Sequence, residues 1–295
     1  MIIGTNHLNC LPPRARELHG SLSTPVEINS RLFRAWKGPP ILALVIGINK
    51  YTSPTLSCLQ GAVADADNFE DFLKESLKVP DTNIISLRDE QASRQKILSA
   101  FTSLRNIAKY KKDEAAIIIY FAGHGAQTNK TNEWHDWDAS NGRVGLICPS
   151  DIGRPTIARA NGVEYEDVIQ GISGRLVSAH LNRISHVKGN NIVSIFHSLK
   201  SNLTKLSTPK TLILDCCFSA GINRRSGNIT DSFSGKFHSS YVLLAACGRD
   251  QKAREHPVTK EGLFTSNLMK VLRANDINTL TYTSLIDRME MPDLW

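Results

Sequence analysis

The sequence predicts an α/β domain built on a mainly parallel β-sheet flanked by helices. Continuous apolar runs rich in β-branched residues, such as Ile41–Ile48 and Ala115–Phe121, are typical of strands buried on both faces. Helical segments separate such runs along the chain, and this alternation favours parallel strands joined by crossover helices. The composition agrees, because 41% of the 295 residues are apolar and 21% are charged, as in folded globular proteins.

Each expected element follows from its residue pattern. In Gly61–Lys78 the apolar residues recur at steps of three and four, which is the period of an amphipathic helix. Ser93 stands where an N-cap residue belongs, ahead of a second amphipathic segment. Further helices are expected at Ser173–Val187 and Phe264–Arg273. The expected strands are Ile41–Ile48, Asn83–Leu87, Ala115–Phe121, Val144–Pro149, Thr211–Asp215 and Tyr241–Cys247.

The chain is expected to hold one domain at residues 41–290, behind a leader or linker at residues 1–40. The leader contains two Pro pairs and shows only weak periodicity. Residues 126–143 are polar and are expected to form an exposed loop. No strand is followed by a phosphate-binding loop or a dinucleotide fingerprint, so a nucleotide-binding function has little support.

Composition argues against several other classes of protein. The longest apolar run, Ile41–Ile46, is far shorter than the roughly 20 residues of a membrane helix, and the first residues do not resemble a signal peptide. The six cysteines lack C-x-x-C zinc spacing, so we expect reduced thiols, no bound metal and a cytoplasmic location. The net charge of +7 comes without a block of like charges, so neither a nucleic-acid nor a membrane partner is expected.

Two of the expected strands end in residues that can carry chemistry. Ala115–Phe121 leads into a Gly-His-Gly run centred on His124, and Thr211–Asp215 leads into Cys216 and Cys217. Sites in α/β proteins gather at the carboxyl ends of strands, so His124 and a cysteine should meet at one sheet edge. An adjacent imidazole raises the thiolate fraction of a cysteine and can protonate a leaving amine. Such a pair is sufficient for amide hydrolysis, although His or Cys at a strand end more often serves packing or a turn.

Asp215 immediately precedes the two cysteines. Because side chains alternate along a strand, Asp215 and Cys217 should project to one face while Cys216 points to the other. A carboxylate beside a thiolate raises the pKa of the thiol, which opposes nucleophilicity unless the acid faces a cation. An Arg or Lys before the scissile bond of a peptide substrate would supply that cation. The alternative is that Asp215 caps a turn or the N-terminus of a helix.

Four segments together resemble the caspase-like cysteine peptidases, and above all the metacaspase-type domains of fungi. They are ALVIGINKY…GAVADA from Ala43 onward, YFAGHG at 120–125, DCCFSAG at 215–221 and LLAACGRDQKARE at 243–255. The resemblance covers residues 41–290 and implies a caspase-like three-layer sandwich, with a mainly parallel central sheet between helices. It also implies a cysteine endopeptidase that acts on protein or peptide substrates.

The resemblance assigns a role to each matching residue. Cys217 would be the nucleophile, and His124 the general base and acid. The backbone N–H groups of Gly125 and Cys217 would form the oxyanion hole. Asp65 and Asp215 would line a pocket for Arg or Lys, which implies cleavage after basic residues and not after Asp.

The sequence also departs from the family pattern. Phe218 stands where the family usually has a His after the nucleophile. Many relatives need calcium held by aspartates, and Asp151 matches one of these positions. The paired aspartates expected later fall at Ser173-Gly174, so a complete calcium site is not expected, nor is any other cofactor. The polar loop Gly221–Lys236, which contains basic residues, is a candidate for self-cleavage into two fragments.

The alternative function is a catalytically impaired caspase-like module that binds partner proteins. Three departures favour it: Phe218, an apparent insertion at Val193–Lys210, and the end of the chain at Trp295 before the last strand that the family leads us to expect. Failure of Cys217 to react with an Arg-directed electrophilic peptide would favour this module over the peptidase.

The insertion predicts a transcript variant. Removing Val193–Lys210 joins Asn190-Asn191-Ile192 directly to Thr211–Asp215 and restores the family pattern without a gap. The codons for Val-Ser-Ile can read GTGAGTAT, which resembles a splice donor, so our hypothesis is a retained intron. Sequencing of transcripts across this junction should reveal messages that lack the segment. Messages that all retain it would refute the hypothesis.

Overall fold

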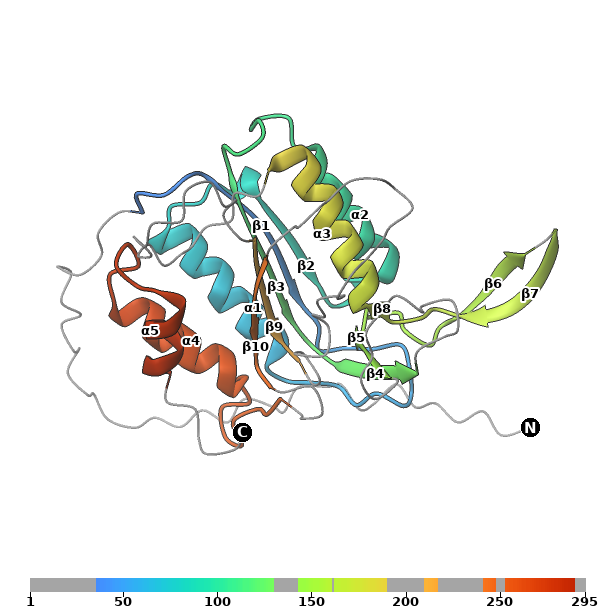
Figure 1. Ribbon diagram of the computed structural model, residues 1–295. Coiled ribbons are helices and arrows are strands. Elements are labelled where there is room, and N and C mark those ends of the chain that lie inside the picture. The colour runs from blue at the N-terminus through green and yellow to red at the C-terminus, as the bar shows by residue number, and fades with distance from the viewer. Residues whose placement is uncertain are drawn as a thin grey trace.

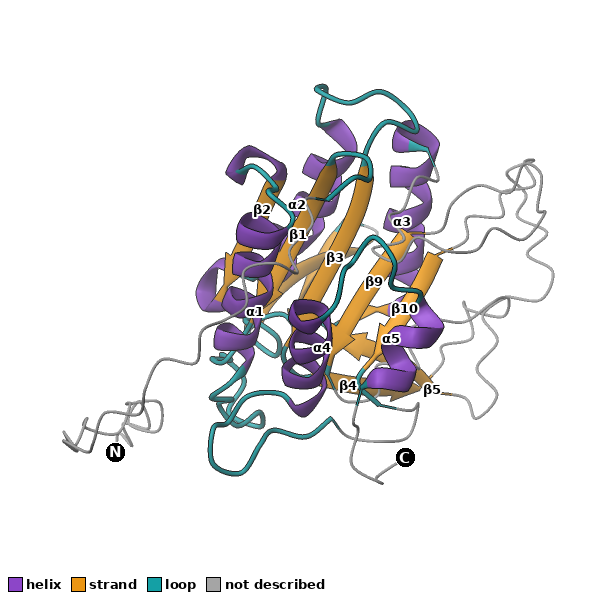
Figure 2. Cartoon of the chain, turned by 90° about the vertical axis from the view of Figure 1, so that its left-hand side faces the viewer, coloured by secondary structure: helices purple, strands orange, loops and turns teal. Residues whose placement is uncertain are grey.

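A computed structural model describes residues 36–129, 143–160, 162–189, 210–216, 241–247 and 253–289. Its centre is a five-stranded sheet with the order β10-β9-β3-β1-β2, in which every pair of neighbours is parallel (Figure 2). These strands are β1 (Ile41–Gly47), β2 (Ile84–Arg88), β3 (Ala116–Ala122), β9 (Lys210–Asp215) and β10 (Tyr241–Ala245). The prediction of a mainly parallel sheet is confirmed.

The apolar strands lie in the middle of the sheet. Every residue of β1 and of β3 is buried, as a continuous apolar run requires when both faces of the strand are covered. Side chains from alternate positions enter two separate hydrophobic clusters, one on each face, so that Leu44 and Val45 belong to different clusters. The sheet therefore has an apolar cluster on each of its faces.

Helices cover both faces of the sheet and complete three layers (Figure 1). One layer holds α1 (Ala62–Asp71), which continues as a π-helical turn at Phe72–Ser76, with α4 (Leu263–Ala274) and α5 (Tyr282–Arg288). The other holds α2 (Arg94–Asn106) and α3 (Gly174–Lys188). Single 3₁₀ turns lie at Asp81–Asn83 and Asp89–Gln91. The three-layer sandwich expected from the family resemblance is confirmed.

The starts of α2 and α3 agree with the sequence. The Ser93 side chain accepts a hydrogen bond from the Lys96 N–H, and the Ser173 side chain accepts one from the Leu176 N–H. Each serine therefore satisfies one of the backbone donors that a helix N-terminus leaves without an intrahelical acceptor.

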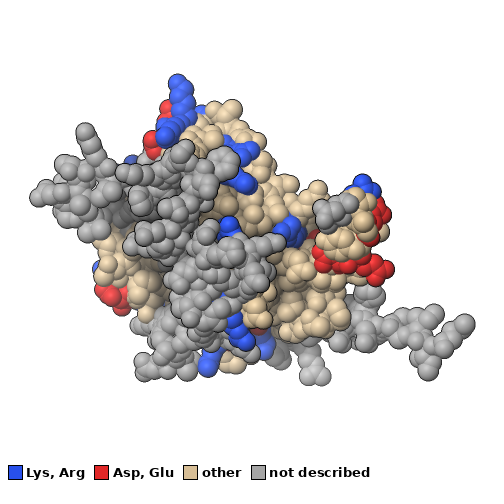
Figure 3. Space-filling view, turned by 45° about the vertical axis from the view of Figure 1, so that its right-hand side comes forward, with Lys and Arg blue, Asp and Glu red and all other residues tan. Residues whose placement is uncertain are grey.

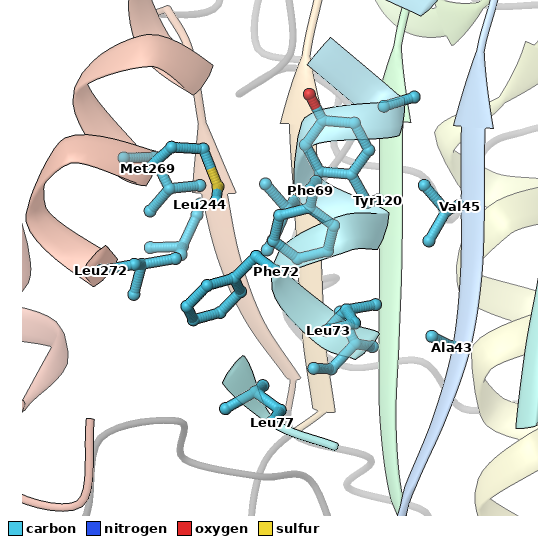
Figure 4. Close-up of a cluster of buried hydrophobic side chains, with 14 of the residues drawn as sticks. Ala43, Val45, Phe69, Phe72, Leu73, Leu77, Tyr120, Leu244, Met269 and Leu272 are labelled. Carbon is cyan, nitrogen blue, oxygen red and sulfur yellow. The ribbon is translucent and has the colours of Figure 1, made fainter. Parts of the chain in front are cut away.

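Aromatic side chains fill the layer between α1 and the sheet (Figure 4). The rings of Phe69 and Tyr120 stack with a centroid separation of 4.5 Å and an interplanar angle of 14°. Met269 and Leu272 from α4 pack into the same cluster. This packing fixes α1 and α4 against β3 and β9, whose ends carry the polar residues described below.

Two smaller sheets were not expected from the sequence. β4 (Gly125–Asn129), β5 (Arg143–Ile147) and β8 (Ile172–Ser173) form an antiparallel sheet, and β6 (Pro155–Ala160) with β7 (Val163–Val168) forms a hairpin that projects from the body (Figure 1). The prediction of a loop at residues 126–143 is thus wrong for residues 126–129 and for Arg143, and residues 130–142 lie outside the described residues. Backbone pairing with β5 makes residues 126–129 a strand, although their side chains are mostly polar.

Several expectations fall outside the described residues. They concern the leader up to residue 35, the loop at 221–236 and the inserted segment at 193–209. The last residue assigned to the insertion, Lys210, is described and is the first residue of β9. None of the helices in the described part of the chain has both the length and the apolar character needed to cross a bilayer. On the face shown in Figure 3, Lys and Arg are scattered over the surface and do not form one basic patch.

Candidate active site

The ends of β3 and β9 lie next to each other. Their parallel register pairs Ala122 with Asp215, and the Gly123 N–H donates to the Asp215 carbonyl oxygen at 3.2 Å. His124 follows two residues after Ala122. The end of β9 and the histidine therefore lie at the same edge of the sheet, as the parallel arrangement predicts.

Two residues of the loop after β1 hold His124 in place. The backbone N–H of His124 donates to the Tyr51 hydroxyl at 2.7 Å, and the two rings lie 4.9 Å apart between centroids. The imidazole Nε2 lies 2.8 Å from the Ser57 carbonyl oxygen. A carbonyl can only accept, so Nε2 carries the proton and Nδ1 of the neutral ring is left as an acceptor. The contact with Ser57 therefore assigns the hydrogen-bond roles of the two ring nitrogens.

The glycines beside His124 have separate structural reasons. A Cβ atom at Gly123 would lie 2.7 Å from the Tyr51 hydroxyl oxygen, so a larger residue would displace the group that holds the histidine. The Cys148 N–H donates to the His124 carbonyl, which makes Gly125 and Ile147 a pair without mutual hydrogen bonds in the antiparallel ladder. The Gly125 N–H therefore points away from β5 and is not used in pairing with that strand.

Two buried carboxyl groups lie at the same edge. Asp65 of α1 and Asp215 of β9 are 3% and 7% exposed. Burial, and then the neighbouring Asp215 carboxylate, raises the pKa of Asp65 to about 8, although a hydrogen bond from the Gly262 N–H opposes this. Burial raises the pKa of Asp215 to about 6, against the hydrogen bonds from Thr265. Near neutral pH the pair therefore holds about one proton.

Asp215 also caps α4. Its Oδ2 accepts the backbone N–H of Thr265 at 3.2 Å and the Thr265 hydroxyl at 2.7 Å, in the first turn of α4. The N-cap residue of this helix, Gly262, has no side chain that could cap it. With the Thr265 hydroxyl donating to Asp215, the Tyr120 hydroxyl 2.6 Å away becomes the donor to Thr265. The alternative that Asp215 caps a helix is therefore confirmed, and its role in substrate binding stays a prediction.

Gly262 provides the space between the two acids. A Cβ atom at this position would lie 2.3 Å from Asp215 Oδ2 and 2.9 Å from Asp65 Oδ2. The Asp65 Oδ2 accepts the Gly262 N–H at 2.8 Å, which draws the loop before α4 onto α1. Only a residue without a side chain leaves both carboxyl groups facing one cavity.

This cavity has a volume of about 220 Å³. That is less than the roughly 300–1,000 Å³ of a typical small-molecule site and suits a single long side chain. The lining residues are Leu59, Ala62, Asp65, Ala122, Gly123, His124, Asp215, Ala253, Arg254, Glu255 and Gly262. Within the described residues, no Lys or Arg forms an ion pair with Asp65 or Asp215. A cationic side chain would meet two acids there.

Sequence reasoning missed three residues of this site. Tyr51 positions His124, Thr265 holds Asp215, and Glu255 lines the cavity while accepting the Gly61 N–H at 3.3 Å. Glu255 is the last residue of the segment 243–255 that carries the family resemblance, but nothing in the sequence pattern indicates that its carboxylate lies at the site. Its isolated β-bridge with Gly262 brings it to the cavity.

Of the two adjacent cysteines, Cys216 belongs to the described residues and Cys217 does not. Cys216 is 1% exposed and belongs to the hydrophobic cluster on the α2–α3 face, whereas Asp215 meets α4 on the opposite face. This is the alternation expected of a strand. Cys217 and Phe218 lie outside the described residues, so the proposed nucleophile remains a prediction from the sequence.

The residues around Asp151 do not fit a calcium ion. Asp151 Oδ1 accepts the Arg94 N–H at 2.8 Å, and Asp151 lines a cavity together with Arg94, Arg154 and Asp167. Calcium prefers several carboxylate and carbonyl oxygens, and cationic side chains oppose it. Among the described residues, no group of three or more His, Cys, Asp or Glu is arranged to hold a metal.

Replacement of Asp65 by Asn should change how stability depends on pH. The pKa of Asp65 is about 8 in the folded protein and near 4 in an unfolded chain, so its contribution to folding is present at low pH and is lost as pH rises through about 8. Asn stays neutral and can still accept the Gly262 N–H. The free energy of unfolding of Asp65→Asn and of wild type is measured by chemical denaturation at pH 5 and at pH 8.5. From the lower to the higher pH, the variant should gain more than about 1.4 kcal/mol relative to wild type, which is the equivalent of one pKa unit. An unchanged difference between the two pH values would contradict the raised pKa.

Comparisons with known proteins agree with this architecture. The chain is 27% identical over 243 residues to Metacaspase-3 of Arabidopsis thaliana, covering 78% of this chain and 59% of that protein. It is 29% identical over 112 residues to Metacaspase-1A of Aspergillus oryzae, covering 37% of this chain and 25% of that protein. The chain thus spans less than two thirds of the length of these relatives.

A solved structure shares the fold. The crystal structure of protein GSU0716 from Geobacter sulfurreducens matches with a TM-score of 0.52 at 16% identity, and the match covers 86% of this chain and 90% of that one. At that identity the similarity concerns the fold alone. The family model described as the caspase domain matches residues 41–291, which is most of the chain, and the chain therefore belongs to the caspase domain family.

Proposed function

We propose that this chain is a cysteine endopeptidase that hydrolyses peptide bonds after Arg or Lys. The observation that carries the proposal is the pair of buried acids, Asp65 and Asp215, which line one narrow cavity with His124. Family membership supports the peptidase chemistry, and the charge of the cavity supports the preference for a basic side chain.

Chain geometry supports Cys217 as the partner of His124. Ala122 and Asp215 are paired in register, and His124 and Cys217 each follow their member of that pair by two residues. Adjacent strands lie about 4.8 Å apart, so two equal steps beyond a registered pair keep a sulfur within reach of an imidazole. Cys216, which lies in the opposite hydrophobic cluster, does not have this position.

The proposed reaction proceeds through a thioester. His124 Nδ1 takes the proton of the Cys217 thiol, and the thiolate attacks the carbonyl carbon of the scissile bond. The N–H groups of Gly125 and Cys217 stabilise the resulting oxyanion. His124 returns its proton to the leaving amine, and then activates the water that hydrolyses the thioester and regenerates the thiol.

The carboxyl pair would select the substrate by charge. An Arg or Lys side chain in the cavity lowers both carboxyl pKa values, so the proton held near neutral pH is released as the cation binds. Cleavage efficiency should therefore increase with pH between about 6 and 8, the range in which the two acids lose their protons. An acidic side chain would face unfavourable like charges in the same place.

Replacement of Cys217 by Ala tests the nucleophile. We expect kcat/KM for a reporter peptide ending in Arg to fall by at least about 10⁴-fold, because no other group can form the thioester. Cys216→Ala is the matched control, since it removes the neighbouring sulfur from the opposite face and should keep most of the activity. A reporter ending in Asp should not be cleaved by either protein.

The same variants test self-cleavage and the alternative function. Active wild-type protein should separate into two fragments at the loop 221–236, whereas Cys217→Ala should remain one band on a denaturing gel. Loss of activity in Cys216→Ala but not in Cys217→Ala would show that Cys216, and not Cys217, is the nucleophile. An inactive wild-type protein in which an Arg-directed electrophile leaves Cys217 unlabelled would favour the partner-binding module.

Gly262→Ala tests the substrate pocket without changing a charge. Gly262 has φ of −63°, which Ala adopts easily, so the added methyl group acts mainly by occupying the space between the two carboxyl groups. We expect kcat/KM for the Arg-ended reporter to fall by about 100-fold or more. The rate at which iodoacetamide modifies Cys217 should stay close to that of wild type. Unchanged cleavage would show that the basic side chain binds elsewhere.

A further inference from the structure

A second cavity lies at the starts of α2 and α3, the two helices that cover the same face of the sheet (Figure 1). Its volume of about 510 Å³ falls within the range of roughly 300–1,000 Å³ that is typical of small-molecule sites. Arg94, the first residue of α2, borders it, and so do Ser173 and Arg175 at the beginning of α3. It shares no lining residue with the cavity that holds Asp65 and Asp215, so the two cavities are separate.

The lining of this cavity contains two arginines, Arg94 and Arg175, and no Asp or Glu. Two acids, Asp151 and Asp167, line a neighbouring cavity that Arg94 also borders. Asp151 Oδ1 accepts the backbone N–H of Arg94 at 2.8 Å, and Asp167 Oδ1 accepts the Val168 N–H at 2.7 Å. None of the ion pairs found among the described residues joins either acid to the Arg94 guanidinium. The positive charge of Arg94 is therefore not neutralised by a described carboxylate.

The side chain of Arg94 also has a buried donor without an acceptor. Its Nε is buried, and no hydrogen-bond acceptor meets it within the described part of the chain. Buried N–H groups are nearly always paired, and an unpaired one costs free energy. A guanidinium offers Nε and Nη as a planar fork that matches two oxygens of one oxyanion. An oxyanion that meets this fork would supply the acceptor that the protein does not.

The start of α3 favours an anion at the same place. The Ser173 side chain accepts the Leu176 N–H, so its own hydroxyl hydrogen is left to be donated. The N-terminus of a helix carries partial positive charge and is a frequent site of phosphate binding. This charge acts together with Arg94 and Arg175, which distinguish the cavity from an ordinary helix N-terminus.

The number of donors and the size of the cavity define the class of ligand. A phosphate group has three acceptor oxygens and can meet Arg94, Arg175 and Ser173 together, whereas a carboxylate has two. Phosphate alone is small for this volume. Three apolar side chains also line the cavity, namely Leu146, Leu176 and Ala179. A ligand that fits both parts carries a phosphate at one end and an apolar group at the other.

We propose that this cavity binds a phosphate monoester of a small molecule with an apolar group, and that Arg94 and Arg175 hold its phosphate. The proposal goes beyond the proposed peptidase function and does not depend on it. It places an anion, and not a metal ion, beside the part of the chain where the residues around Asp151 do not fit calcium.

Calorimetric titration of full-length protein with phenyl phosphate, at fixed ionic strength, tests the site. We expect Arg94→Gln to weaken binding by at least about tenfold, because hydrogen bonds to a charged group are lost. Arg105→Gln is the matched control, since it makes the same change in the last turn of the same helix and should bind like wild type. An equal loss in both variants would overturn the proposal, because it would show only a general attraction of anions to the protein.

Two further variants separate loss of the site from loss of folding. Arg175→Gln changes an exposed side chain and should weaken binding by at least about tenfold as well. Arg94→Lys keeps the positive charge but lacks Nε and the planar fork, so it should also bind more weakly than wild type. The unliganded variants should have the melting temperature of wild type. Wild-type affinity in Arg94→Lys would refute the role of the fork, and wild-type affinity in Arg175→Gln would refute the two-arginine site.

Two other probes test the class of ligand. Benzoate has the same ring as phenyl phosphate but only two oxygens, and inorganic phosphate lacks the ring. Phenyl phosphate should bind at least about tenfold more tightly than either, because it alone offers both the phosphate and the apolar contact. Equal binding of benzoate would overturn the preference for phosphate, and equal binding of inorganic phosphate would overturn the apolar part. Wild-type protein that does not bind phenyl phosphate would overturn the whole proposal, whether or not the protein cleaves peptides.

Discussion

The packing of two carboxyl groups around one glycine is the constraint on which the site depends. Asp65 comes from α1, Asp215 from β9 and Gly262 from the start of α4, so three elements far apart in sequence must meet within a few ångströms. Burial without a basic partner among the described residues keeps the pKa values of both acids high. Such an arrangement costs stability. Under the proposed function, the basic side chain of the substrate offsets this cost.

The hydrophobic core makes that packing possible. Phe69 on α1 stacks on Tyr120 of β3, and the Tyr120 hydroxyl reaches Thr265 of α4. One aromatic residue thereby links the apolar layer to the polar group that holds Asp215. The position of the acids is thus determined by the same contacts that hold the helices on the sheet.

Much of this architecture could be predicted from the sequence because its signals are local. The run Ile41–Ile48 and the run Ala115–Phe121 are apolar on both faces, and Ser93 marks a helix start by its position alone. Asp65, His124 and Asp215 could be singled out because strand ends and family motifs mark them. Each of these features depends on residues close together in the chain.

Other features depend on contacts that no local pattern records. Gly125–Asn129 is polar and becomes a strand only through backbone pairing with β5. Tyr51 acts through one hydrogen bond to His124, 73 positions away, and Thr265 acts through two hydrogen bonds to Asp215, 50 positions away.

The capping of α4 by Asp215 has an evolutionary consequence. A mutation that removes this acid to accept a different substrate would also leave the first turn of a core helix without its anchor, since Thr265 would lose both of its bonds to the carboxylate. A change of preference at this subsite therefore needs a compensating replacement in α4. Under the proposed function, the charge selectivity of the pocket should therefore persist across descendants for reasons of folding, even where selection on the substrate relaxes.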